Sequence, residues 1–170
     1  MIDRKLYPVT GLLLALTAAL ATALVASWWW LRPAQAAPDV ELLHIDGQRS
    51  RLASLQGTPT LLNFWATDCD VCLAEQPAWV ALYEELAPRG LDLVGVAMPY
   101  DPPNRVLEWA ESRALPYPVA LDLDGAVALA FGPVRVTPTT VLIDAEGRIR
   151  WTRLGRLDMT ELREELLALL

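Results

Sequence analysis

Cys69 and Cys72 are the residues whose type and spacing point most directly to chemistry. They are the only cysteines in the 170-residue chain, so the pair has no other internal partner. They stand where an apolar run ends and helical spacing begins. The first turn of a helix offers unpaired N–H groups and the positive end of the macrodipole, which favour a thiolate over a thiol. Cys69 is therefore predicted to be the exposed nucleophile and Cys72 the resolving thiol.

Other uses of a cysteine pair fit the sequence less well. A zinc site needs about four protein ligands, or three and water, and the only histidine is the distant His44. Haem attachment needs a histidine directly after the second cysteine, where Leu73 stands. Dithiol chemistry and an inert structural bridge remain. Redox chemistry is favoured, because so short a loop closes little chain entropy and makes a poor staple.

The elements around the pair form a strand, a helix and a second strand. The apolar segment Thr60–Trp65 predicts a buried strand, and helical spacing continues from Cys69 to about Ala87. Pro77 lies inside that helix and predicts a kink rather than an end. Leu91–Met98 predicts the second strand, so the unit is βαβ and the fold class is α/β.

The rest of the chain from about residue 39 onward predicts short helices and strands. Val40–Ile45 is expected to be an edge strand, and Asn104 is expected to cap a helix that ends near Arg113. Asp158 and Glu161 resemble a capping box at the start of the last helix. The other predicted elements are an extended segment 116–121, a short helix ending near Phe131, a strand 139–144 and its hairpin partner 149–152.

The amino-terminal segment predicts a membrane anchor. Residues 9–31 carry no charge, end in a tryptophan cluster and are long enough to cross the roughly 30 Å hydrocarbon layer. Arg4 and Lys5 precede them, which places residues 1–8 in the cytoplasm. Ala34-Gln35-Ala36 resembles a signal-peptidase site, so a cleaved export signal is the alternative. Both interpretations export the domain, predicted to be residues 39–170 after a tether 32–38.

The net charge of −7 argues against a nucleic-acid partner, for which a basic face is expected. Export agrees with a disulfide-forming pair, because disulfides persist in oxidising compartments.

The order of motifs resembles a thioredoxin-fold protein of the TlpA/ResA/CcmG type. Asn63-Phe-Trp-Ala-Thr67, Cys69-x-x-Cys72-x-x-Glu75-x-Pro77 and Val136-Thr-Pro-Thr-Thr140 match that family in order and spacing. The stretch 92–124 corresponds to its insertion. The resemblance covers about residues 39–170. It implies a central mixed sheet flanked by helices, a membrane-anchored domain facing the bacterial periplasm, and thiol-disulfide exchange without a cofactor or metal.

The resemblance also implies roles for single residues. Pro138 corresponds to a cis-proline beside the Cys69 sulfur that turns the Thr137 backbone toward an extended substrate. Glu75 lies three residues after Cys72 on the same side of the helix. Burial would raise its pKa and make it a proton acceptor for the resolving thiol; the alternative is a solvated helix acid. Trp65, Asp68 and Thr137 are expected to contact substrate.

Three places in the sequence depart from the family pattern. Asp68 replaces the tryptophan common before the first cysteine, and Val71 replaces the usual proline before the second. Asp68 and Asp70 therefore flank Cys69. A carboxylate about 6 Å away costs a thiolate roughly 0.7–3 kcal/mol. Destabilising the reduced form in this way predicts a reductant. Arg135-Val136 also stands where family members often have glycine, which predicts a differently shaped substrate groove.

The sequence predicts an enzyme that exchanges the Cys69–Cys72 disulfide with exported proteins. An integral-membrane thiol relay is the expected electron donor, and cytochrome c maturation or related thiol homeostasis is the expected role. One alternative is a thioredoxin-fold copper chaperone, although Sco-type proteins use a Cys-x-x-x-Cys spacing and a downstream histidine that this chain lacks. A second alternative is a redox-inert interaction module.

Overall fold

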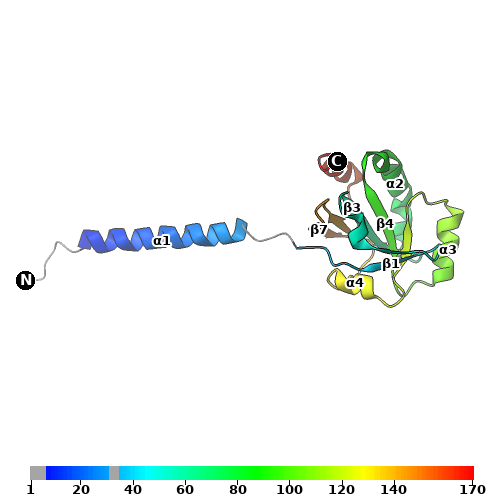
Figure 1. Cartoon of the computed structure of the whole chain (residues 1–170), viewed down its shortest axis with the longest axis horizontal. Coiled ribbons are helices and arrows are strands. Elements are labelled where there is room, and N and C mark those ends of the chain that lie inside the picture. The colour runs from blue at the N-terminus through cyan, green and yellow to red at the C-terminus, as the bar shows by residue number, and fades with distance from the viewer. Residues whose placement is uncertain (1–6, 31–34) are drawn as a thin grey trace, which may run out of the picture. The chain divides into compact units, whose positions relative to one another are not determined.

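The computed structural model describes residues 7–30 and 35–170. The chain divides into two compact units, Met1–Ala34 and Gln35–Leu170. The first contains helix α1 (Tyr7–Trp30), which overlaps the predicted anchor (Figure 1). Among the residues that the structure describes, no helix combines the length and apolarity needed to cross a membrane. Residues 1–6 and 31–34, which hold much of the predicted cytoplasmic segment and part of the predicted tether, lie outside the described residues.

The second unit is built on one mixed sheet of seven strands in the order β2-β1-β5-β4-β3-β6-β7. At its centre β3 (Thr60–Trp65) runs parallel to β4 (Asp92–Ala97), as the βαβ pattern predicts. The remaining strands are β1 (Glu41–His44), β2 (Arg49–Arg51), β5 (Val119–Leu121), β6 (Thr139–Ile143) and β7 (Ile149–Leu154). β5 is parallel to β4, whereas β6 is antiparallel to β3. The predicted α/β class with a mixed sheet is confirmed.

Helices cover both faces of this sheet (Figure 1). Leu61 and Trp65 of β3 pack with α2 (Asp70–Leu86), α3 (Pro103–Ser112) and α5 (Met159–Leu167). Leu62 and Phe64 point to the other face, which α4 (Ala126–Ala130) and the 3-10 turn η1 (Leu52–Leu55) cover; a second 3-10 turn, η2 (Ala87–Arg89), follows α2. Alternate residues of β3 thus supply two apolar clusters, and burial on both faces holds the strand end before Cys69 in place.

Two local predictions agree with the structure. As predicted, helix α2 continues through Pro77 and does not end there. Asp158 is confirmed as the cap of α5, because its carboxylate accepts hydrogen bonds from the Thr160 and Glu161 amides.

Two other predictions were wrong. β1 pairs with both β2 and β5, so it is not the edge strand. Asn104 does not cap α3: the helix begins at Pro103, and Pro102 holds the cap position without a side-chain bond. Proline suits the first position of a helix because it has no N–H group to satisfy there.

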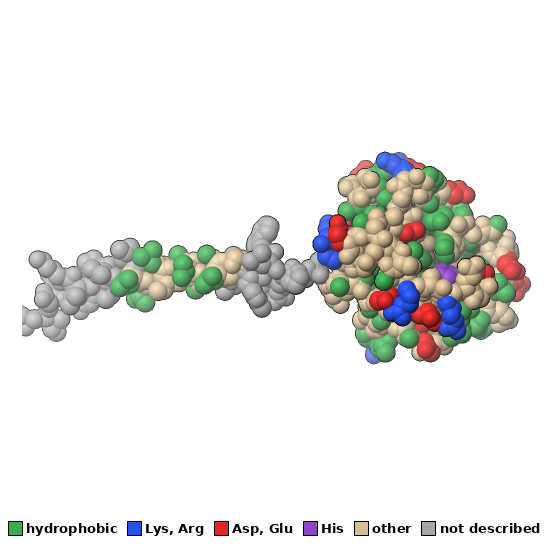
Figure 2. All heavy atoms as spheres, in the orientation of Figure 1, with side chains coloured by type: hydrophobic (Ala, Val, Ile, Leu, Met, Phe, Trp, Pro, Cys, Tyr) green, Lys and Arg blue, Asp and Glu red, His purple; other side chains and the backbone are tan. Residues whose placement is uncertain are grey.

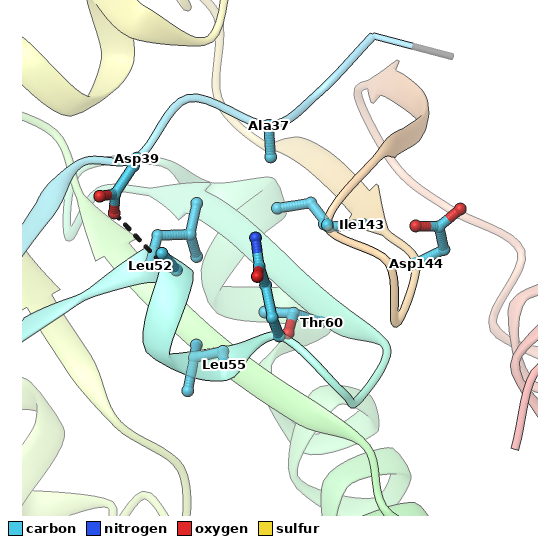
Figure 3. A pocket seen from close by; sticks show the side chains of 10 residues that line it. Ala37, Asp39, Leu52, Leu55, Thr60, Ile143 and Asp144 are labelled. Atoms are coloured by element: carbon cyan, nitrogen blue, oxygen red, sulfur yellow. Dashed lines mark hydrogen bonds between the residues drawn. The ribbon is translucent and has the colours of Figure 1, made fainter. Parts of the chain in front are cut away.

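Residues 35–37 of the predicted tether belong to the folded unit. The Ala37 amide donates to the Gly147 carbonyl at 2.8 Å, and the Ile149 amide donates to the Gln35 carbonyl at 2.8 Å. Asp39 accepts a hydrogen bond from the Ala53 amide, and Ala37 and Asp39 line a small pocket that Thr60 also lines (Figure 3). Thr60 begins β3, whereas the cysteines follow the other end of that strand, so this pocket is separate from the disulfide.

The surface of this unit mixes charges of both signs. Figure 2 shows basic and acidic side chains interspersed on the visible face. Several lie in pairs, such as Arg163 with Glu85 and Arg51 with Asp39. Exposed pairs of this kind contribute little to stability, typically below about 1 kcal/mol.

Candidate active site

The two cysteines form a disulfide at the start of α2, with their Cα atoms 5.2 Å apart. Cys69 is the N-cap residue of the helix, and its sulfur accepts a hydrogen bond from the Cys72 amide at 3.2 Å. The Cys69 side chain is half-buried, whereas Cys72 is only 2% exposed. Solvent and substrate can thus reach the first sulfur and not the second. This asymmetry is what an attacking and a resolving thiol require.

Pro138 lies opposite the strand that leads to the cysteines. In the antiparallel pairing of β3 with β6, Phe64 faces Thr139. β6 begins at Thr139, directly after Pro138, so Pro138 lies at the same end of the sheet as Trp65, where β3 ends. The Thr137–Pro138 peptide bond is cis, as the resemblance implied. The cysteine loop and the proline loop therefore form two walls at the same end of the sheet.

Glu75 lies one turn beyond Cys72 and is buried, with 6% of its surface exposed. One carboxylate oxygen accepts a hydrogen bond from the Leu157 amide at 3.0 Å, and the other is buried without a hydrogen-bond partner. Burial raises the pKa of Glu75 above its usual value, although the Leu157 amide and nearby Arg156 oppose that shift. The predicted direction of the pKa shift is confirmed. The alternative of a solvated helix acid is excluded.

The three predicted substrate contacts differ in their placement. Trp65 is 2% exposed and packs in the core, where its indole nitrogen would lie 3.1 Å from a Cβ atom placed on Gly95. It supports the strand end from inside, which corrects the expectation of a substrate contact. Asp68 is exposed immediately before Cys69, and Thr137 is half-buried immediately before the cis-proline. These two residues remain available to a substrate.

Asp101 also shapes the site, although the sequence did not single it out. It is buried, and its two oxygens accept hydrogen bonds from the Thr67 amide and the Thr67 hydroxyl, both at 2.6 Å. It therefore holds the segment that leads into Cys69. One signal was present: Asp101 lies in the loop that follows β4, and the carboxyl ends of neighbouring parallel strands meet at one edge of a sheet.

A second buried hydrogen bond supports α2 from behind. The Gln76 amide donates to the Tyr117 hydroxyl at 2.6 Å, and the Tyr117 ring lies edge-on to Tyr83 with centroids 5.7 Å apart. Burial raises the pKa of Tyr117, so its hydroxyl stays protonated. Among the described residues, no group of three or more His, Cys, Asp and Glu side chains is placed to hold a metal ion.

The fold and the site define a thioredoxin-fold protein with a dithiol centre, and comparisons with known proteins agree. A thiol:disulfide interchange protein of the thioredoxin family from Chlorobium tepidum superposes with a TM-score of 0.74 at 26% identity, over 81% of this chain and 97% of that one. Residues 33–152 match the AhpC/TSA family. The chain belongs to this thioredoxin-like family.

Relatives of this chain indicate the class of reaction. The thiol-disulfide oxidoreductase ResA of Geobacillus thermodenitrificans is 31% identical over 168 residues, which are 96% of this chain and 95% of the relative. The thiol:disulfide interchange protein DsbE of Yersinia pestis is 37% identical over 114 residues, 66% of this chain and 57% of the relative. Together with the Cys69–Cys72 pair, these similarities identify the chain as a thiol-disulfide oxidoreductase of the ResA/DsbE type.

Proposed function

We propose that this protein is an exported, membrane-anchored reductant of protein disulfides. The observation that carries the proposal is the unequal exposure of the two sulfurs at the start of α2. An accessible Cys69 and an enclosed Cys72 favour exchange with a large partner through a single sulfur. Its substrates are disulfides of exported proteins, in cytochrome c maturation or related thiol homeostasis.

The proposed reaction uses the side chains of Cys69, Cys72 and Glu75. The Cys69 thiolate attacks one sulfur of a substrate disulfide; a mixed disulfide forms and the second substrate sulfur leaves as a thiolate. Cys72 then gives its proton to the Glu75 carboxylate and attacks the Cys69 sulfur. The internal disulfide forms, and the substrate leaves with both thiols reduced. A membrane dithiol returns two electrons to the pair and is itself oxidised to a disulfide.

The charge around the pair supports the reducing direction. Asp68 and Asp70 flank Cys69, Glu75 lies one turn beyond Cys72, and α2 carries no Lys, Arg or His. Negative charge near the cysteines disfavours thiolates and leaves the neutral disulfide unaffected. A couple whose reduced form is destabilised is a stronger reductant.

The membrane location rests on the amino-terminal sequence. The uncharged segment 9–31 is preceded by Arg4 and Lys5, so we propose a single pass through the bacterial inner membrane with the domain in the periplasm. Cleavage after Ala36 would instead release a soluble periplasmic domain.

Trapping of mixed disulfides tests both parts of the proposal. In bacteria that express the full chain, Cys72→Ser removes the resolving thiol, so Cys69 adducts with exported proteins are expected to accumulate. They are detected as bands on non-reducing gels that collapse after reduction. The same bands are expected in membranes that have been extracted at alkaline pH, which removes peripheral proteins.

Cys69→Ser is the matched control, because it leaves only the enclosed sulfur of Cys72. It is expected to form no adducts. Equal adducts in both variants, or none in Cys72→Ser, contradict the exchange reaction. Adducts found only in the soluble fraction contradict the anchor and leave the exchange reaction intact.

A further inference from the structure

The loop after β4, residues 99–102, contacts both walls of the site. Asp101 faces the cysteine wall and accepts the two hydrogen bonds from Thr67. The loop is itself tied down, because the Asp101 amide donates to the Met98 carbonyl and the Met98 amide donates to the Trp65 carbonyl, both at 3.0 Å. This side of the loop is therefore fixed to the end of β3.

The neighbouring residue Tyr100 faces the proline wall. Its hydroxyl lies 3.4 Å from the Thr137 hydroxyl, at the residue that precedes the cis-proline. That contact is long for a hydrogen bond between hydroxyl groups, which prefer about 2.7–2.8 Å. The Tyr100 side chain is 55% exposed. A fixed backbone thus presents an exposed aromatic ring at the wall where an extended substrate is expected.

Further exposed apolar side chains lie on the two walls. Val136 directly precedes Thr137 and is 52% exposed, and Val71 lies between the two cysteines and is 39% exposed. Isolated exposed apolar residues are ordinary, but here each lies in the cysteine loop or the proline loop that forms the site. An exposed tyrosine offers a large contact area at a low cost in conformational entropy, which suits recognition.

We propose that Tyr100 is a specificity-determining residue, which packs against an apolar side chain next to the reactive cysteine of an extended substrate. This inference rests on the proposed disulfide exchange. Asp101 holds the loop, and the weak contact between Tyr100 and Thr137 yields when the substrate segment lies along Thr137. The preferred substrates are protein segments with an aliphatic or aromatic neighbour beside the cysteine.

Paired peptides test the proposal. Reduced full-length protein in detergent micelles is given one of two peptides with an internal disulfide, identical except for Val or Ser beside the first cysteine. Wild type is expected to show a lower KM for the Val peptide by about 3- to 10-fold, with little difference in kcat. Tyr100→Ala is expected to reduce this KM ratio to near one, and Tyr100→Phe to keep it, because the ring makes the contact.

Two controls separate recognition from reactivity. Each variant's rate with dithiobis(nitrobenzoate), which has no peptide side chains, reports the intrinsic reactivity of the thiols and normalises the peptide data. Leu129→Ala removes a similarly exposed apolar side chain from α4, on the other face of the sheet, and is expected to keep the wild-type ratio.

The outcomes distinguish the two proposals. A Val preference that survives in Tyr100→Ala overturns the role of Tyr100, as does its loss in Tyr100→Phe. Failure of wild type to reduce either peptide, while it still reduces dithiobis(nitrobenzoate), overturns the proposed exchange with proteins on which this inference rests.

Discussion

The carboxylates on the two sides of the disulfide differ in their contact with water. Asp68 and Asp70 flank Cys69 and are exposed, whereas Glu75 is buried one turn beyond Cys72. Water and salt screen the exposed pair, while burial strengthens the interactions of the third. Three acids close to each other in the sequence therefore have unequal influence. Glu75, and not the aspartates, is expected to control the chemistry of the pair.

Replacing Glu75 is expected to give the largest effect. Glu75→Gln keeps the shape of the side chain and removes the proton acceptor for Cys72, so resolution of a mixed disulfide is expected to slow by about 100-fold near neutral pH. In wild type the rate of this step rises as pH increases through the raised pKa of Glu75, and the variant lacks that rise. Rapid-quench measurement of a Cys69–glutathione adduct records both.

Glu84→Gln is the matched control for this experiment, because it removes an exposed carboxylate from the same helix. It is expected to keep the wild-type rate and pH profile. An equal effect of the two substitutions would show that the net charge of α2 matters and that the burial of Glu75 does not.

The free energy of unfolding is also expected to depend on pH through the raised pKa of Glu75, with a smaller effect. The pKa of Glu75 is raised in the folded state, so folding favours its protonated form. Below the pKa of the unfolded chain, about 4.3, both states are protonated and the carboxyl group imposes no penalty. As pH rises through the folded-state pKa, the free energy of unfolding of wild type falls relative to that of Glu75→Gln. Urea titrations of both oxidised proteins from pH 4 to 8 measure the difference in the free energy of unfolding. A difference that does not change with pH would contradict the claim that ionisation of the buried Glu75 destabilises the fold.

The exposed aspartates are expected to give the smallest effect. In water each carboxylate about 6 Å from a thiolate costs about 0.7 kcal/mol, or about 15 mV for a two-electron couple. Asp68→Asn with Asp70→Asn should therefore raise the reduction potential by no more than about 30 mV at a pH where Cys69 is ionised when reduced. Wild type is expected near or below thioredoxin, about −270 mV. Equilibration with dithiothreitol buffers gives both values, and a shift well above 30 mV would place the control of the couple at the aspartates instead.

The sequence contained most of the local structure around the disulfide. The apolar run before Cys69 and the helical spacing after it predicted the β3–α2 unit, and the resemblance of Val136-Thr-Pro-Thr-Thr140 to a family motif implied the cis-proline. The position of Glu75 within one helix turn of Cys72 also predicted its role as a candidate base. These features depend on residues close together in the chain, where periodicity and motif spacing carry the information.

Only the tertiary structure decided which of these side chains are enclosed and what holds them. Thr67 is held by Asp101, 34 residues later, and Glu75 accepts a hydrogen bond from Leu157, 82 residues later. The burial of Trp65 and the exposure of Asp68 likewise depend on how distant segments pack. Screening and desolvation depend on burial, and burial is set by contacts between residues far apart in sequence. The sequence by itself therefore determined the reactive pair and its local frame, whereas the packed fold determined the electrostatics and the walls of the site.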